Sequence, residues 1–450
     1  MDMLIAVYER GEALSYQIDE RPAEYDKKTL HSIIDSLISM YDYPHGGFGK
    51  GAKFPPSCAL LLLISYYERY RAGELKDIIE STLDSMMSRG LCDHLQGGFF
   101  RYCVDREWTI PHFEKMLYDQ AMLLWVYSWA LKVFDKPEYK NTVAGIIESL
   151  DETFFYNGFY ISAHDADTNH KEGETYLWGV EELKEHLNSA ELEYLLDNYF
   201  ITDEGNFEGK NHLIRIRGFI KGPVEKKLLD IRNKRIQPFA DRKIITSWNA
   251  LTGIALIMAW RATGDRSILD KAEALMDKLI ELHFNDGKLS HSSFEGVQQK
   301  EEFLEDSASL LLFATYLHEE NRNREKSMNL LADSVKKYYR GEWYENINND
   351  FENVKASVFD HPVPSSLSLV TLAMLRYSLL LNISLILPEE KHVLWSEFYS
   401  LAVFMSDGHW HVIHSPEVLS WDRLSLNSIQ VPGNKFSDCF EGSCNDSLIK

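Results

Sequence analysis

The densest group of chemically competent side chains lies between residues 93 and 119. Two histidines, His94 and His112, stand there among acids, bases and aromatic residues, directly before an apolar run. An ordinary histidine pKa lies close to neutrality, so an imidazole can both remove and return a proton. We therefore expect His112 and His94 to act as general acid or base, with Lys115 facing the same cavity as His112 from one helix.

Carboxylates form the second candidate group, in the run Ser-Ala-His-Asp-Ala-Asp at residues 162–167. The pair Asp165 and Asp167 suits general acid/base catalysis, because one carboxyl can stay protonated while the other is ionised. The same pair suits a bound cation, and the ordinary alternative is that both residues cap a turn. Asp306, which stands before another apolar run, is a third candidate acid. Neither an EF-hand nor a zinc-ligand motif is present, so we expect no metal.

Apolar residues recur mainly at helical spacing, as in Leu30, Ile33, Ile34 and Leu37. The predicted helices cover 27–41, 57–72, 74–89, 112–134, 137–155, 179–198 (broken), 247–263, 266–284, 302–320, 324–339, 365–382 and 388–405. Strand signals are sparse, and a partly alternating stretch predicts one small β insertion near 199–222. The polar stretch 222–243 is expected to be an exposed insertion.

Glycine beside an aromatic or turn residue recurs between the helices, at spacings of about 50 to 65 residues. A period of this size is typical of helical hairpins that bury their faces on one another. Six hairpins in series predict an all-α (α/α)6 toroid with the second helix of each hairpin in an inner ring; an open α-solenoid is the alternative. In a toroid, the loops before the inner helices meet at one rim, so their charged and aromatic residues should share one cavity.

The composition bounds the possible partners. The 450 residues are 45% hydrophobic, enough for a large core, and carry a formal net charge of −22, which repels nucleic acid. The apolar runs are too short to span a bilayer and the N-terminus lacks a signal-peptide pattern, so we expect a cytoplasmic protein with no membrane partner. Phosphate-loop and dinucleotide motifs are absent, so no cofactor is expected. Cys439 and Cys444 would bind a metal or form a disulfide.

A longer motif connects these features. It comprises Gly46-Gly47-Phe48-Gly49, Lys53-Phe54-Pro55, Asp93-His94-Leu95-Gln96-Gly97-Gly98-Phe99, Arg101-Tyr102, Asp105, Trp108, Pro111-His112-Phe113-Glu114-Lys115-Met116-Leu117-Tyr118-Asp119, Asp165-Ala166-Asp167, Thr246-Ser247-Trp248-Asn249 and Leu304-Glu305-Asp306. This pattern resembles the spermatogenesis-associated protein 20 family over roughly residues 40 to 445. The resemblance implies a six-hairpin glycosidase-like toroid, similar to that of the N-acylglucosamine 2-epimerases, which in the family follows an N-terminal thioredoxin-like domain.

The chain departs from that family in several places. The thioredoxin-like domain is not found, so we expect residues 1–40 to be an N-terminal segment with the first helix of the toroid, and a separate thioredoxin-like chain is a candidate partner. The toroid is expected over 41–422 and a loosely packed tail over 423–450. The local departures are Ala250 for a usual Gly, Ser307 for a usual Tyr, and Pro364-Ser365-Ser366-Leu367-Ser368 without the Asn of a Pro-Ser-Gly-Asn-Ser motif.

Residue types and resemblance together favour epimerisation or isomerisation of a sugar or sugar-like ligand, by proton removal next to a carbonyl. Arg101 and Lys115 would stabilise the negative charge of an enediolate oxygen, and tryptophans would stack on the ring. The ligand-binding candidates are Arg101, Trp108, Lys115, Tyr118, Trp178, Trp248 and Asn249. Two alternatives stay open: hydrolysis by a carboxylate pair, and a non-catalytic module that binds a ligand or a protein.

Overall fold

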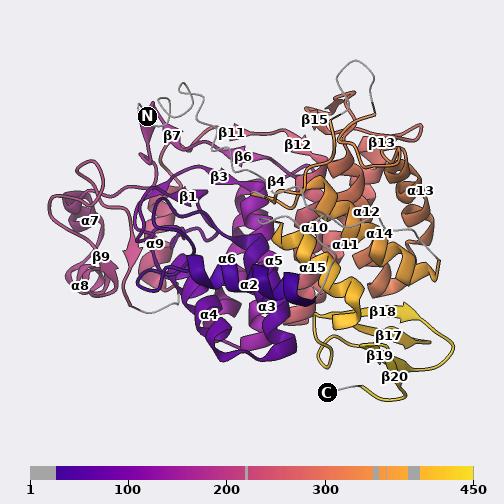
Figure 1. Cartoon of the computed structure of the whole chain (residues 1–450). Helices are drawn as coiled ribbons and strands as arrows, with labels where there is room; N and C mark the ends of the chain where they lie inside the picture. The colour runs from indigo at the N-terminus through magenta and orange to yellow at the C-terminus, as the bar shows by residue number, and fades with distance from the viewer. Residues whose placement is uncertain (1–26, 218–220, 348–353, 361, 384–395, 449–450) are drawn as a thin grey trace.

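Figure 1 shows the computed structural model of the chain, whose described residues are 27–217, 221–347, 354–360, 362–383 and 396–448. Short strands and long loops gather at one end of the helical body, the top in this view, and a small sheet lies at the opposite end. Within these ranges, no helix is both long and apolar enough to cross a membrane. Most of the predicted N-terminal segment, residues 1–26, lies outside the described residues.

Six helices of the described chain form a closed inner ring. They are α3 (Ser57–Tyr70), α5 (Leu117–Phe134), α10 (Thr246–Thr263), α12 (Leu304–Asn321), α14 (Ser366–Leu381) and α15 (Glu397–Phe404). Each packs against the next in this order, and α15 packs against α3. They are buried on nearly every side, which explains why their sequences are apolar all round rather than along one stripe. The closed ring confirms the (α/α)6 toroid and excludes the open solenoid.

Outer helices complete the described hairpins. They are α2 (Lys27–Met40), α4 (Gly73–Ser88), α6 (Pro137–Ser149), α11 (Arg266–His283) and α13 (Glu325–Lys336). Each contacts the inner ring along one apolar face, which in α11 includes Leu269, Ala272, Leu275 and Met276, the stripe that helical spacing predicts. Of the last predicted helix, residues 388–395 lie outside the described part of the chain, and the remainder is α15.

The start of α5 differs from the prediction. The helix expected over 112–134 begins at Leu117. Before it, Pro111–His112 form strand β2 and Lys115–Met116 form strand β3, and each is paired with another strand. This pairing satisfies the backbone in an extended conformation and overrides the local helical periodicity. α6 likewise ends early and continues as a π-helical turn, η1 (Leu150–Phe154).

The insertion between α6 and α10 builds a second, smaller core. Helices α7 (Val180–His186), α8 (Ser189–Asn198) and α9 (Pro223–Arg232) pack Leu183, Leu195 and Leu228 together. No helix was predicted at α9, whose charged residues outnumber its apolar ones. The small β insertion is confirmed as the antiparallel pair β9 (Tyr199–Phe200) and β10 (Ile214–Arg215).

Short strands position the ends of the inner helices. They are β1 (Tyr102–Cys103), β4 (Phe155–Tyr156), β5 (Phe159–Tyr160), β6 (Ala163–His164), β7 (Asp167–Thr168), β8 (Lys171–Glu172), β11 (Ala240–Asp241), β12 (Ile244–Ile245), β13 (Phe284–Asn285), β14 (Lys288–Leu289), β15 (Ser292–Phe294) and β16 (Val297–Gln298). Two three-stranded sheets, β11-β6-β3 and β12-β15-β16, lead into α5 and α10. They therefore fix which way the side chains at these helix starts point.

The C-terminal residues form a four-stranded sheet in the order β18-β17-β19-β20. Its strands are β17 (His411–Ser415), β18 (Ser428–Pro432), β19 (Ser437–Phe440) and β20 (Ser443–Asn445), and the turn η2 (Met405–His409) precedes them. Ile429 and Val431 are buried in the main core, which differs from the loosely packed tail expected over 423–450. A disulfide joins Cys439 and Cys444, which face each other across β19 and β20.

Candidate active site

Three neighbouring inner helices, α5, α10 and α12, begin at the strand-rich end of the toroid (Figure 1). The residues at these three helix starts, together with the strands that lead into them, are named the mouth below. Helices that are apolar all round have little structural use for polar side chains beyond capping. The polar and aromatic residues of the mouth are therefore the main candidates for catalysis and ligand binding.

His112 lies at the mouth between two carboxylates. Its Nδ1 is 2.7 Å from Oε1 of Glu172, and its Nε2 is 3.7 Å from Oε2 of Glu114. The imidazole is partly open to solvent, with 29% of its side-chain surface exposed. The hydrogen bond with Glu172 raises the pKa of His112, which favours the protonated ring at neutral pH.

Arg101 connects this histidine to the start of α5. Its Nη1 donates to Oε2 of Glu114 over 2.8 Å, and its guanidinium interacts electrostatically with the phenol of Tyr118. The Tyr118 ring meets the indole of Trp248, at the start of α10, edge to face with centroids 4.8 Å apart. Tyr118 is only 4% exposed, whereas Trp248 is partly exposed, so the indole face, supported by the Tyr118 ring, is the surface on which a sugar ring can stack.

A second histidine–carboxylate group lies at the start of α12. Nδ1 of His291 is 2.8 Å from Oδ2 of Asp306, whose other oxygen accepts the backbone N–H of Ser247 over 3.0 Å. Oε1 of Glu305 is 3.7 Å from the same imidazole nitrogen. Burial, with the neighbouring Asp306, raises the pKa of Glu305 to about 7, and the hydrogen bond to Asp306 raises the pKa of His291 against the effect of its burial. These groups therefore share protons near neutral pH.

The same three side chains have the composition of a metal site. One ligand atom each from His291, Glu305 and Asp306 lies within 4.8 Å of the others. Imidazole with carboxylates suits several divalent ions, so the residues present fit such an ion. The sequence motifs behind the expectation of no metal do not contain this group, because its histidine and its carboxylates lie on separate elements.

Asp119 lies in the first turn of α5 and is almost completely buried. Its Oδ2 has no hydrogen-bond partner among the described residues. Burial raises the pKa of Asp119 well above its ordinary value, which favours the protonated carboxyl. It interacts electrostatically with Arg101 and Glu114.

Contacts link the two histidine groups without a break. Their order is His112, Glu114, Arg101, Tyr118, Trp248 with its neighbour Ser247, Asp306 and His291. Of the predicted site residues, the structure thus brings together His112, Arg101, Tyr118, Trp248 and Asp306. The arrangement sets a proton donor and a proton-sharing group at the two ends of an aromatic surface.

The predicted carboxylate pair lies elsewhere. Asp165 and Asp167 are exposed, and Oδ1 of Asp165 accepts the backbone N–H of Asp167 over 3.3 Å. Asp167 then begins the β7–β8 hairpin, paired with Glu172. This is the turn-capping arrangement that was the ordinary alternative, and neither carboxylate joins the contacts of the mouth.

Other predicted residues are buried in structural roles. His94 hydrogen bonds with the backbone oxygen of Arg89, and burial lowers its pKa to about 3, so it stays neutral. The indole of Trp108 donates to the backbone oxygen of Gly46, and the Trp178 ring lies 3.8 Å from the guanidinium of Arg235. Asn249 holds the backbone N–H and oxygen of Tyr160.

Lys115 does not face the cavity of His112. The expectation assumed one helix through both residues, whereas β2 and β3 are extended, and side chains three positions apart on an extended chain point to opposite sides. Nζ of Lys115 instead donates to Oδ2 of Asp93 over 2.7 Å inside the protein. This lysine therefore has no place in the chemistry of the mouth.

Three residues of the mouth were not predicted as site residues from the sequence: Asp119, Glu172 and His291. Glu172 lies 60 positions from His112, and His291 lies 15 positions from Asp306, so no short spacing reveals either pair. Asp119 did carry a signal, because it is the one acid in the first turn of α5, a helix made mainly of apolar residues. An isolated charge in a helix that is buried all round is costly and marks a position for chemistry.

Comparisons with curated proteins confirm the resemblance. The chain is 31% identical to human spermatogenesis-associated protein 20 over 278 residues, which cover 51% of this chain and 34% of that protein. It is 29% identical to the mouse protein over 333 residues, covering 62% and 42%. An uncharacterised protein of Caenorhabditis elegans is 29% identical over 411 residues, covering 78% and 56%. The chain thus spans about half the length, or less, of these relatives. No family profile matches it.

Solved structures confirm the fold. Cellobiose 2-epimerase from Spirochaeta thermophila superimposes with a TM-score of 0.52 at 11% identity, covering 85% of this chain and 86% of that chain. A D-mannose isomerase gives a TM-score of 0.51 at 12% identity, covering 80% and 83%. At identities this low the likeness establishes the shared toroid alone.

Proposed function

We propose that this chain, a relative of spermatogenesis-associated protein 20, binds a sugar or sugar-like ligand at the mouth and catalyses its epimerisation or isomerisation. One observation carries the proposal. Two partly exposed histidines, His112 and His291, are each held by carboxylates at opposite ends of the Tyr118–Trp248 aromatic pair. Two such groups on either side of a bound ring would serve as proton acceptor and proton donor.

The proposed reaction begins with proton removal. The Glu305–Asp306–His291 group takes the proton from the carbon next to the carbonyl, and the C–H electron pair becomes part of a carbon–carbon double bond. The carbonyl electron pair moves to oxygen and gives an enediolate. Protonated His112 and the Arg101 guanidinium stabilise that oxygen. Protonated His112 delivers a proton to the opposite face to give the epimer, and the two groups then regain their starting protonation states by exchange with water. For the isomer, the first group returns its proton to the former carbonyl carbon, while the proton of the neighbouring hydroxyl passes to the former carbonyl oxygen.

Hydrolysis is the second candidate, because Asp119 is a buried acid with a raised pKa that interacts with the charged residues Arg101 and Glu114. A protonated carboxyl of this kind is what a glycosidase uses to protonate a leaving group. A binding module without turnover is the third. Its support is that His112 and Glu172, and Arg101 and Glu114, already form closed pairs. A cytoplasmic location and a separate thioredoxin-like partner stay predictions.

The test needs no knowledge of the product. The protein is incubated in deuterium oxide with aldoses, ketoses and N-acetylated amino sugars, and NMR records deuterium entering the carbon next to the carbonyl. The proposal expects wash-in for one sugar class, loss of at least about a hundredfold in His112→Ala, and no change in His186→Ala, an exposed histidine of α7. Release of a reducing sugar from glycosides without wash-in would favour hydrolysis, and ligand-induced thermal stabilisation without either reaction would favour binding alone.

A further inference from the structure

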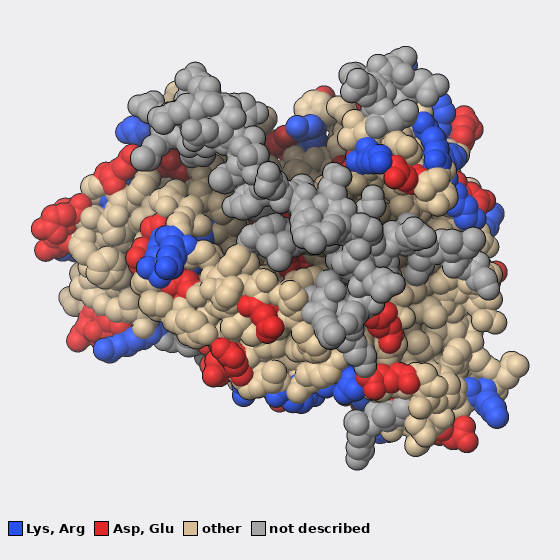
Figure 2. All heavy atoms as spheres, viewed as in Figure 1, with Lys and Arg blue, Asp and Glu red and all other residues tan. Residues whose placement is uncertain are grey.

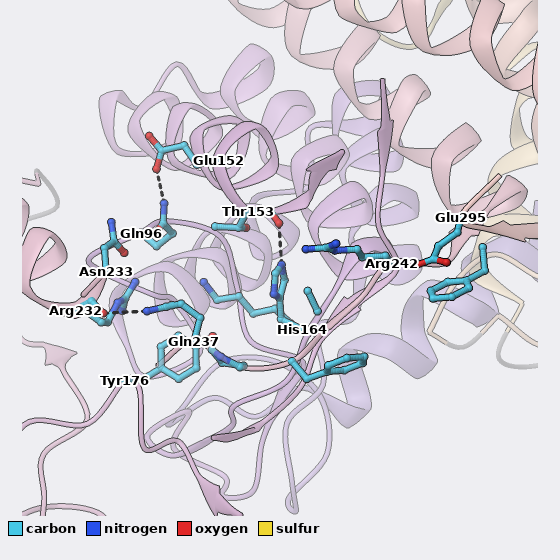
Figure 3. Close-up of a pocket in the computed structure, with 15 residues that line it drawn as sticks. Gln96, Glu152, Thr153, His164, Tyr176, Arg232, Asn233, Gln237, Arg242 and Glu295 are labelled. Atoms are coloured by element: carbon cyan, nitrogen blue, oxygen red, sulfur yellow. Dashed lines mark hydrogen bonds between the residues drawn. The ribbon is translucent and has the colours of Figure 1, made fainter. Parts of the chain in front are cut away.

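A cavity lies beside the three-stranded sheet β11-β6-β3. Its volume is about 670 Å³, and Figure 3 shows the side chains around it. Lys115 and His164 reach it from β3 and β6, and Arg232 and Asn233 from the end of α9. None of the mouth residues His112, Tyr118, Trp248 and His291 is among its described lining residues. The cavity is therefore separate from the proposed site of catalysis.

The floor of this cavity is an unbalanced buried ion cluster. Lys115 and Arg232 are only 3% and 4% exposed. Nζ of Lys115 donates to Asp93 over 2.7 Å, and Arg232 binds both oxygens of the same carboxylate over 2.8 and 2.9 Å. Among the described residues, Asp93 is the only carboxylate that pairs with either cation. Two cations and one anion leave a formal charge of +1 in a place that water hardly reaches.

Both cations also have N–H groups without a hydrogen-bond acceptor among the described residues. Besides Asp93, Lys115 bonds only the backbone oxygen of Gly97, at 3.3 Å, so one of its three N–H groups lacks an acceptor within the described chain. Arg232 uses two of its five N–H groups on Asp93 and, within the same ranges, has no acceptor for the others. A buried excess charge with unused donors is costly, and an anion in the cavity would offset both costs.

The upper part of the cavity is different in character. The ring of Tyr176 forms a wall, and Phe239 at the entrance is 71% exposed. The entrance also carries Arg242 and two exposed carboxylates, Glu152 and Glu295 (Figure 3). Water screens charges at the entrance, so they influence a ligand less than the buried cations below. The cavity therefore offers an anion site at its floor and aromatic surface above it.

We propose that this cavity binds a small organic oxyanion of sugar size. Its phosphate or carboxylate group lies at Lys115 and Arg232, and its body lies against Tyr176 and Phe239. Arginine and lysine together are a common pair for oxyanion recognition, because the guanidinium supplies directed donors and the ammonium supplies a compact charge. The site is independent of the acid/base chemistry proposed for the mouth.

Isothermal titration calorimetry at low ionic strength tests the proposal with four probes: inorganic phosphate, glucose 6-phosphate, glucuronate and glucose. We expect at least one of the anions to bind and glucose not to bind, and a preference between phosphate ester and carboxylate identifies the group that the floor takes. Binding of glucose as tight as that of its 6-phosphate would overturn the proposal. So would a complete lack of anion binding by protein whose circular dichroism shows it folded.

Variants place the ligand. Asn233→Asp adds a carboxylate to the cavity wall while keeping all three residues of the ion cluster, and we expect it to raise the Kd of the anion about tenfold or more. Asn434→Asp, in the exposed turn between β18 and β19, makes the same charge change far along the chain and should leave the Kd unaltered. Phe239→Ala should weaken glucose 6-phosphate but not inorganic phosphate. Equal affinities for Asn233→Asp and the unaltered protein, or loss of anion binding in His112→Ala, would contradict this location.

Discussion

Tyr118 and Trp248 meet edge to face where α5 and α10 begin, and each ring is tied to a different charged group. The Tyr118 phenol interacts electrostatically with Arg101, and the residue before Trp248 holds Asp306 through its backbone N–H. This aromatic contact therefore lies between the two histidine–carboxylate groups. A change in either ring alters the stacking surface and the relative position of the groups that would move protons.

We expect Trp248→Leu to weaken sugar binding about tenfold or more, because the leucine removes the stacking surface while keeping an apolar side chain. The matched control is Trp260→Leu, on the same helix near its other end, where the indole donates to Glu320. Sugar-induced thermal stabilisation of each purified variant provides the comparison. Equal losses in both variants would show a general destabilisation of α10 instead of a role at the mouth.

The pH dependence of wash-in should follow the proton-sharing group. Glu305 has a pKa raised to about 7, so the rate should rise as pH increases through about 7 and the carboxylate form appears. Glu305→Gln removes a negative neighbour of Asp306, which lowers the pKa of Asp306 and should move the rising part of the profile to lower pH. Rates measured from pH 5 to 9 decide this, and an unaltered profile in the variant would remove this group from the mechanism.

Stability should decline toward neutral pH because of Glu397, at the start of α15. Burial raises its pKa from 4.5 to about 7, so the folded protein binds a proton that the unfolded chain does not between these values. Its contribution is therefore full below pH 4.5 and is lost as pH rises to about 7. We expect Glu397→Gln to flatten this slope and to raise the free energy of unfolding at pH 8 by about 2 kcal/mol.

Urea unfolding at pH 5 and pH 8 measures the effect of Glu397→Gln. The control is Glu185→Gln, an exposed glutamate of α7, which should keep the slope of the parent protein. A slope that persists in Glu397→Gln would assign it to other buried carboxyls, of which Asp360 is the nearest candidate because burial raises its pKa to about 6.

Removal of the carboxylate from the buried ion cluster should be severe. Asp93→Asn leaves Lys115 and Arg232 as neighbouring buried cations, and we expect it to lower the free energy of unfolding by about 3–5 kcal/mol. Glu181→Gln breaks the exposed pair with Lys184 and should cost less than about 1 kcal/mol. Denaturant titration of both variants checks the contrast. Similar small losses in the two would mean that the cluster is already hydrated or neutralised.

The toroid could be predicted from the sequence because the patterns that indicate it lie within short stretches of the chain. Apolar stripes such as that of α11 and the glycine-rich turns recur with the hairpins, and both survive in the fold. The position of each residue within its hairpin also predicted that His112, Tyr118, Trp248 and Asp306 lie at one end of the toroid, since each stands at or just before the start of an inner helix. What periodicity does not encode is strand geometry: β2 and β3 turned Lys115 away from His112, and the β12–β15 pairing brought His291 beside Asp306.

Residue type alone gave wrong predictions where a polar or aromatic side chain has a structural hydrogen bond instead of a role in ligand binding. His94, Trp108 and Asn249 carry groups that bind sugars in many proteins, yet each here satisfies a backbone atom of another loop. In a chain with so many long loops, backbone groups away from regular elements need partners, and polar side chains supply them. A sequence motif rich in such residues therefore contains both structural residues and candidate catalytic residues. The hydrogen-bond partner of each side chain in the structure tells the two kinds apart.

The contacts of α3 with residues near the C-terminus have a consequence for how the chain is made. Ser65 of α3 hydrogen bonds with Asn427, which lies 362 positions later, and Trp410 donates to the same serine. During synthesis the apolar residues of α3 leave the ribosome before Trp410 and Asn427 are made. At ordinary rates of translation, Asn427 follows on the order of 20 to 70 s later. The apolar side chains of α3 are exposed to aggregation throughout that interval.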